Sequence, residues 1–195
     1  MKAIHGGKTK NDKIDSYKIA KLLRGGTLPM AYPHPAKMRA TRDLLRRRTY
    51  MVRQCGLLLA HIQNTNTQYN LPAFNKKISR KYNRSGVSER FTDPSVKASV
   101  DSDLAMIDAF NRLIKQLEWQ IEKSARQHNY HDLYLLRSIP GVGQILALVI
   151  LYEVEDINRF PTVQNFSSYC RLIRPEKESD GKWAGNSNKK IGNAH

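Results

Sequence analysis

The sequence has few sulfur ligands for metals and no apolar run long enough to cross a membrane. Its two cysteines, Cys55 and Cys170, lie far apart, and its six histidines are scattered, so no zinc-site spacing is present. The longest apolar run, ILALVILY, is too short to span a bilayer. The first residues, MKAIHGGKTKND, contain no apolar segment of a secretory signal. These absences indicate a reduced, cytoplasmic protein that does not insert into a membrane.

Acidic residues are scarce relative to basic ones. The chain of 195 residues has 17 Asp and Glu against 33 Lys and Arg, a formal net charge of +16. Such an excess attracts polyanions, and nucleic acid is the leading partner. An anionic membrane surface is less favoured, because no long basic amphipathic helix with an aromatic face stands out. The apolar fraction of 40% favours elongated helices with a small domain over one large core.

Helical patterns dominate the chain. DKIDSYKIAKLLRGG predicts a short helix that Asn11 or Asp12 caps and that Gly25 and Gly26 end. A connector with three prolines, TLPMAYPHPAK, follows. Long helices are predicted over about 36–69 and 96–127, and shorter ones over 132–138, 144–154 and 162–172. A tail rich in Lys, Asn, Ser and Gly ends the chain. The predicted fold class is therefore mainly α.

The two long helices are expected to pair. Apolar residues in the second alternate at three and four positions, as in a coiled-coil seam. They are Ile107, Phe110, Ile114, Leu117 and Ile121. The segment between the helices is basic and broken by Pro and Gly, which predicts a mobile tip. An antiparallel helical hairpin follows, with a dimer interface or a plain bundle core as alternatives for the seam.

Basic side chains concentrate in the first half of the long helix and near the C-terminus, where we expect contacts to DNA or RNA phosphates. The candidates are Arg42, Arg46, Arg47, Arg53, Lys182, Lys189 and Lys190.

The stretch LLRSIPGVGQILALVI places a proline and two glycines between two apolar runs. Pro140 ends the first helix, and Gly141 and Gly143 permit a positive φ and a close approach of another backbone. The first amides of the helix that follows lack intrahelical partners and can bind phosphate. The pattern resembles a helix-hairpin-helix, which binds the DNA backbone without sequence preference. A tight turn between two packed helices is the alternative.

Asp12 and Asp15 lie three residues apart at a helix start. Such neighbours share a helix face, with Cβ atoms about 5–6 Å apart, and two carboxylates this close can share a divalent metal ion. The alternative is that both acids only stabilise the positive end of the helix dipole.

Three segments together resemble one family, the DEDD-type insertion-sequence transposases of the insertion sequence 110 family. They are GGKTKNDKIDSYKIAKLLRGGTLPMAYPHP, RDLLRRRTYMVRQCGLLLAHIQNTNTQYNL, and the chain from LLRSIPGVG to NKKIGNAH. The resemblance implies that residues 1–36 are the end of a RuvC-like nuclease domain. It further implies that 37–130 are a basic helix and coiled-coil hairpin, and that 131–195 are a transposase domain with the helix-hairpin-helix-like turn.

The resemblance also implies the chemistry. Four acids hold Mg²⁺ in the family, and Asp12 and Asp15 match the third and fourth. The first two lie upstream of any residue here, so we expect a chain truncated at its N-terminus, and also at its C-terminus, with an incomplete Mg²⁺ site. The family's serine nucleophile matches Ser179 in EKESDGKW, with Ser187 as the alternative. A structured guide RNA and a second protomer are implied partners.

The sequence therefore predicts a DNA transposase, or site-specific recombinase, that cuts and rejoins DNA as an insertion sequence moves. The alternative is a DNA- or RNA-binding remnant of such a transposase without chemistry of its own. The two differ in whether the metal site is completed.

Overall fold

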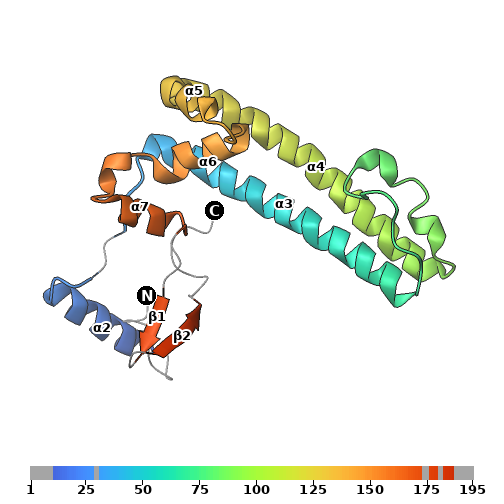
Figure 1. Cartoon of the computed structure of the whole chain (residues 1–195), viewed down its shortest axis with the longest axis horizontal. Coiled ribbons are helices and arrows are strands. Elements are labelled where there is room, and N and C mark those ends of the chain that lie inside the picture. Colours follow the sequence, from blue (N-terminus) through green and yellow to red (C-terminus); the bar gives the residue numbers. More distant parts are fainter. Residues whose placement is uncertain (1–10, 29–30, 173–175, 180–181, 187–195) are drawn as a thin grey trace. The chain divides into compact units, whose positions relative to one another are not determined.

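The structure of the chain, a computed structural model, describes residues 11–28, 31–172, 176–179 and 182–186 (Figure 1). For 176–179 and 182–186 only the backbone is described. Contacts within the chain define two compact units, Met1–His34 and Pro35–His195. The described residues are mainly helical, as predicted. None of the described helices is both long and apolar enough to cross a membrane.

The first unit is built on helix α2 (Asp12–Arg24). The Asn11 side chain accepts a hydrogen bond from the Lys13 amide at 2.9 Å, and the Gly25 amide donates to the Lys21 carbonyl at 3.0 Å. These contacts satisfy backbone groups at the two helix ends, and they confirm the predicted start and stop. No residue of α2 is buried, and its apolar residues, such as Tyr17, are largely exposed.

Helices α3 (Ala36–Gln68) and α4 (Pro94–His128) lie side by side in the second unit (Figure 1). Arg48 pairs with Glu118 at 2.8 Å, and His61 further along α3 pairs with Asp103, which comes earlier in α4, at 2.6 Å. This order shows that the helices run antiparallel. The predicted antiparallel hairpin is therefore confirmed.

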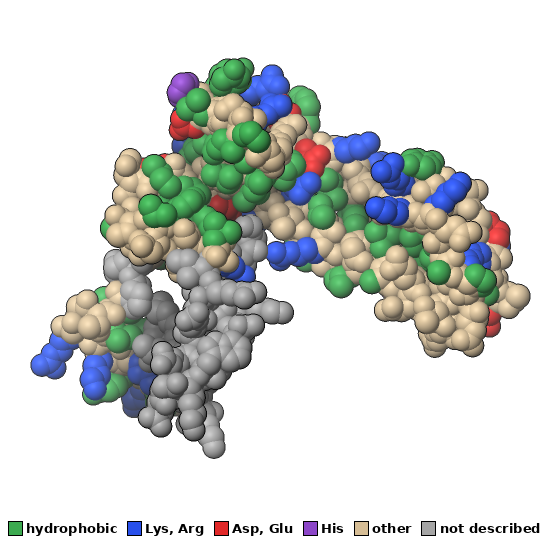
Figure 2. Space-filling view, viewed as in Figure 1, with side chains coloured by type: hydrophobic (Ala, Val, Ile, Leu, Met, Phe, Trp, Pro, Cys, Tyr) green, Lys and Arg blue, Asp and Glu red, His purple; other side chains and the backbone are tan. Residues whose placement is uncertain are grey.

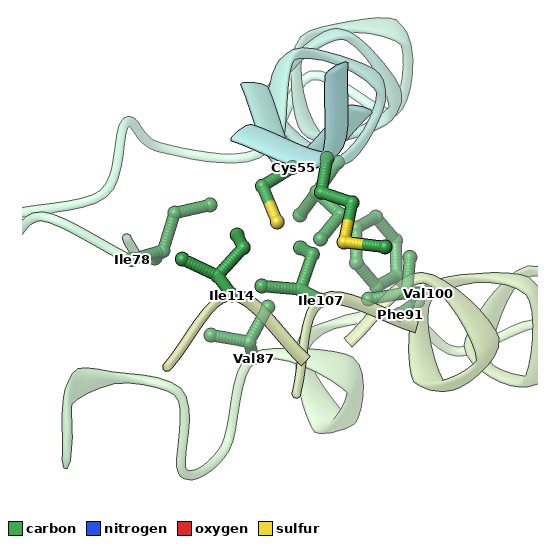
Figure 3. Packing of buried hydrophobic residues seen from close by; sticks show 9 residues of the cluster. Cys55, Ile78, Val87, Phe91, Val100, Ile107 and Ile114 are labelled. Atoms are coloured by element: carbon green, nitrogen blue, oxygen red, sulfur yellow. The ribbon is translucent and has the colours of Figure 1, made fainter. Parts of the chain in front are cut away.

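The apolar seam of α4 is buried within this hairpin. Ile107 and Ile114 are buried and face α3 residues such as Cys55 (Figure 3), and Ile121 is buried further along α4 in a second core. Phe110 and Leu117 pack against the core that contains Ile107 and Ile114. The seam therefore packs within the chain's own helical hairpin, which favours the bundle-core alternative.

The segment between α3 and α4 was expected to be a mobile tip, and that prediction is wrong. It contains two short 3₁₀ helices, η1 (Lys81–Asn83) and η2 (Ser88–Arg90). Ile78, Val87 and Phe91 are buried in the hairpin core. The buried Arg84 donates to two backbone carbonyls and forms an ion pair with Asp108 of α4. The apolar residues of this segment are too irregularly spaced for a periodicity argument to detect them.

The C-terminal part contains three short helices and a two-stranded hairpin. The helices are α5 (Tyr130–Ser138), α6 (Gln144–Val154) and α7 (Val163–Tyr169), with a 3₁₀ turn, η3 (Ile157–Arg159), before α7. Strands β1 (Glu176–Ser179) and β2 (Lys182–Asn186) pair antiparallel where the sequence indicated only a tail. A second core joins the start of α3, the end of α4, α5 and α6. It contains Leu45, Ile121, Ala125, Leu133, Ala147, Leu148, Leu151 and Tyr152.

Candidate nucleic-acid interface

The turn between α5 and α6 is a tight β-turn. The Val142 amide donates to the Ile139 carbonyl at 3.0 Å, and Gly141 between them has a φ of +86°. A turn with proline at its second position requires this left-handed conformation at its third when it is of type II. The prediction of positive φ holds for Gly141 but not for Gly143. Gly143 has a φ of −75° and caps the start of α6.

The start of α6 is open to an incoming group. No side chain caps the helix, and Gly141, Gly143 and Gln144 are all exposed. A Cβ built at either glycine meets nothing within 4 Å. The first amides of α6 therefore point into accessible space, where helix N-termini attract anions. The Gln144 side chain donates to Glu122 of α4 at 2.6 Å, which ties the turn to the long hairpin.

Arg42 and Arg46, two of the arginines predicted to bind phosphate, share one acidic partner within the chain. Arg42 reaches the carboxylate of Glu153 at 2.9 Å, and Arg46 holds it with two bonds of 2.8 and 3.0 Å. Glu153 is only 3% exposed, and its hydrogen bond raises the pKa of Arg46 above the ordinary value. A buried carboxylate requires such partners. Arg42 and Arg46 therefore fasten the start of α3 to the end of α6.

Glu153 was not among the residues predicted from the sequence to belong to the site. The only signal for it is an acid placed in the most hydrophobic segment of the chain, VILYEVED. Such an acid needs a cationic partner if that segment is buried, and the arginine-rich helix offers one. The Tyr169 hydroxyl of α7 also donates to the Glu153 backbone carbonyl at 2.8 Å. Glu153 thus connects α3, α6 and α7.

The remaining predicted arginines of α3 are exposed. Arg47 lies next to Arg46 in sequence but projects outward, with its guanidinium 5.1 Å from the centre of the Tyr50 ring. Arg53 is also exposed. Among the predicted arginines, these two have the accessibility that contact with a phosphate backbone requires.

A polar chain next to Glu153 joins α3, α4 and α6. The fully buried Tyr152 hydroxyl lies 2.8 Å from Nδ1 of His128 and is hydrogen-bonded to Thr41. Burial, with a smaller contribution from the charge of Lys37, lowers the pKa of His128, and burial raises the pKa of Tyr152. With Nδ1 unprotonated, the His128 ring can accept a hydrogen bond from the Tyr152 hydroxyl, which gives a partner to a hydroxyl that is removed from water.

Asp12 and Asp15 lie in the first turn of α2, where Asp12 is exposed and Asp15 is half-buried. Carboxylate oxygens are suitable Mg²⁺ ligands, and the two acids share a helix turn. Within the part of the chain that the structure describes, no third Asp, Glu, His or Cys joins them in a group that could hold a metal ion. The pair therefore fits one side of a metal site and needs ligands from elsewhere.

Ser179 is the last residue of β1, and its Cα pairs with that of Lys182 at the start of β2. The sequence indicated a loop at this serine, so the strand is a correction. The side chains of this hairpin lie outside the described residues, as do Ser187, Lys189 and Lys190 entirely. The roles expected for these residues stay predictions.

Comparisons with known proteins agree at both ends of the chain. A family model described as the transposase IS116/IS110/IS902 family matches residues 133–195. A second model, for the DEDD transposases of the IS110 group, matches residues 1–71. No curated protein matches the chain. The first match covers the exposed turn and the C-terminal hairpin, and the second covers the acid pair and the arginine-rich helix. The chain belongs to the IS110 family of DEDD transposases.

Proposed function

We propose that this transposase chain binds the DNA backbone and takes part in cutting and rejoining DNA as an insertion sequence moves. Membership of the family supports the transposase class. The observation that carries the DNA contact is the Ile139–Gly143 turn. The turn is exposed, and its two glycines leave room for a phosphate. The first backbone amides of α6, which no side chain caps, follow directly after it.

Further phosphate contacts are assigned to basic residues of α3 and of the C-terminal part of the chain. On α3 these are Arg47 and Arg53, which are exposed. Lys182, Lys189 and Lys190 extend the proposal to the end of the chain. Contacts of this kind fix the position of the duplex but do not read its sequence. Each phosphate that is neutralised lowers log K by about 0.9 per unit of log salt on duplex DNA.

Gly143→Val tests the turn directly. The valine is tolerated in the free protein because Gly143 has a negative φ and the space around it is open, whereas Gly141 needs its positive φ. We expect affinity for a duplex oligonucleotide to fall at least 10-fold while the circular dichroism spectrum stays unchanged, because the side chain keeps phosphate away from the amides.

The matched control is Gly56→Val, the same change at an exposed glycine of α3 with no neighbour within 4 Å. It should leave DNA affinity unchanged. If Gly143→Val binds duplex DNA as tightly as the parent, the turn serves packing alone and the proposed contact is wrong.

For the chemistry, we propose that Asp12 and Asp15 supply two carboxylates of a Mg²⁺ site and that Ser179 is the nucleophile. A bound Mg²⁺ would polarise the DNA phosphate and stabilise charge in the transition state. The Ser179 hydroxyl oxygen would then bond to the phosphorus as one phosphorus–oxygen bond of the DNA backbone breaks, and the leaving DNA oxygen would take up the proton that the serine loses. The structure supports only part of this site, since two acids on one helix turn need further ligands.

A structured guide RNA and a second copy of the chain complete the proposal. A second copy can bring additional carboxylates to a serine, and an RNA can select the DNA site that a backbone contact does not read. The net charge of +16 is compatible with binding both nucleic acids.

The alternative function is a DNA- or RNA-binding remnant of a transposase without chemistry of its own. The observation that favours it is the acid pair, which stands on a helix with no buried residue and without a third ligand in the described part of the chain. Trapping of a covalent protein–DNA link separates the two functions.

A further inference from the structure

Exposed aromatic rings occupy the surface where α4 ends and α5 begins. Trp119 is 65% exposed, Tyr130 62% and Tyr134 63%. They are not needed for the core, which contains Ile121, Ala125 and Leu133 from the same two helices. Large apolar surface that remains in water next to polar groups commonly marks an interaction site.

Basic side chains lie between these rings. Two neighbouring grooves share Glu122 and Arg126, and together they form one surface that we name the aromatic–basic groove. Its aromatic residues are Trp119, Tyr130 and Tyr134, and its cations are Lys123, Arg126 and Arg137. Figure 2 shows hydrophobic and basic side chains next to each other over this end of the hairpin.

Glu122, the acid that lines the aromatic–basic groove, is bound by Arg126 and Gln144. Arg126 pairs with Glu122 at 2.7 Å, and that hydrogen bond lowers the pKa of the carboxyl group. Gln144, the first residue of α6, donates to the other carboxylate oxygen. Three cations against one acid leave the lining cationic. The groove also extends to Ser138, so it adjoins the turn that we propose as the phosphate contact.

We propose that the aromatic–basic groove binds unpaired DNA nucleotides. The inference rests on the proposed function, since strands that are cut and rejoined expose bases that have left the duplex. Bases would stack on Trp119, Tyr130 and Tyr134, while Lys123, Arg126 and Arg137 contact the intervening phosphates. Interleaved aromatic and basic side chains are the pattern that single-stranded nucleic acid requires, because every base has a flat face and every linkage a charge.

A second copy of the chain is the other occupant to consider. A symmetric interface would place the same three cations opposite themselves, and the like charges would repel. The contact between Lys123 and the Trp119 ring, at 5.3 Å, also shows that this ring already offers its face to a cation. A polyanion with flat bases complements both features, so charge favours nucleic acid over a second copy.

The test measures binding of a fluorescently labelled oligothymidine of about ten nucleotides to the full chain by anisotropy. Thymidine avoids base pairing within the probe. Trp119→Ala and Tyr134→Ala should each weaken binding on the order of 5- to 100-fold, the range found when one stacked base loses its aromatic partner. Trp119→Phe, which keeps a flat ring, should restore most of the affinity.

Tyr82→Ala is the matched control. Tyr82 is 72% exposed and lies beside Arg80, but it belongs to η1 at the far end of the hairpin. It should bind oligothymidine like the parent. A loss as large as that of Tyr134→Ala would show general attraction to exposed aromatic residues and would overturn the proposal.

Duplex DNA, RNA and self-association are measured in parallel. Trp119→Ala should leave duplex affinity unchanged. If the parent chain binds duplex DNA but not oligothymidine, the proposal for the groove is wrong and the proposed function is unaffected. If the parent chain binds neither, both proposals are wrong. Tighter binding of oligouridine than of oligothymidine assigns the groove to RNA instead. If Trp119→Ala changes only the mass by light scattering, the groove is a contact between copies.

Discussion

Adjacent arginines of α3 perform different tasks, and a single pair of variants separates them. Arg46→Ala removes two of the bonds to the buried carboxylate of Glu153 and should lower the free energy of unfolding by about 1–3 kcal/mol. Arg47→Ala should change that free energy by less than about 0.5 kcal/mol, because its side chain is exposed, yet it should weaken duplex DNA binding. Urea unfolding and fluorescence anisotropy provide the two readouts. If Arg47→Ala lowered the free energy of unfolding and Arg46→Ala did not, the result would contradict the contact between Arg46 and Glu153.

The half-buried His128 makes the stability of the same region depend on pH. The pKa of His128 is lowered in the folded chain, so the unfolded chain binds the proton more readily. The stabilisation is therefore present above the ordinary value near 6.5 and is lost as the pH falls below it through the folded pKa. We expect the melting temperature to drop between pH 7 and pH 5 and the drop to shrink in His128→Gln. An identical pH profile for parent and variant would show that another group is responsible.

At the scale of the elements, sequence patterns predicted the helices well because their signals are local. Asn11 and Gly25 bound α2, Pro35 precedes α3, and the isoleucines of the seam from Ile107 to Ile121 are buried. Contacts between distant residues were not predictable in this way. The bond between Arg46 and Glu153 spans 107 positions, and no periodicity reports such a pairing.

The segment between α3 and α4 is also held by contacts that its sequence pattern does not predict. Its composition is polar and basic, but three scattered apolar side chains and one buried arginine attach it to the hairpin. The short β1–β2 hairpin was missed because EKES and KWAGN are too polar to show a strand pattern. For the candidate site, the sequence identified the turn and the acid pair. The ion pairs of Arg42 and Arg46 with Glu153 became visible only in the structure.

Phe91→Ala tests whether that segment belongs to the core. Phe91 is 5% exposed and meets the Tyr69 ring edge-on at 5.9 Å between centres. Loss of a buried ring should lower the free energy of unfolding by about 3–5 kcal/mol. Tyr82→Ala, in the same segment but exposed, should cost less than about 0.5 kcal/mol. Equal and small effects of both changes would restore the interpretation as a mobile tip.

At the scale of the whole molecule, one chain combines an acid pair, an arginine-rich helical hairpin, an open turn and a serine on a C-terminal strand. The acid pair belongs to one compact unit, and the other three belong to the second. A reaction that uses both the acids and the serine therefore needs the two units, from one chain or from two, to meet on a DNA substrate.

Covalent trapping of DNA tests the central claim most directly. The chain is mixed with a family member whose own serine is replaced by alanine, together with that member's guide RNA and a DNA substrate, and the products are run on a denaturing gel. We expect a protein–DNA adduct that contains this chain, requires Mg²⁺ and disappears in Ser179→Ala. An adduct that persists in Ser179→Ala but is lost in Ser187→Ala would assign the nucleophile to the other serine. No adduct from chains that demonstrably assemble together would contradict the recombinase function and leave a nucleic-acid-binding remnant.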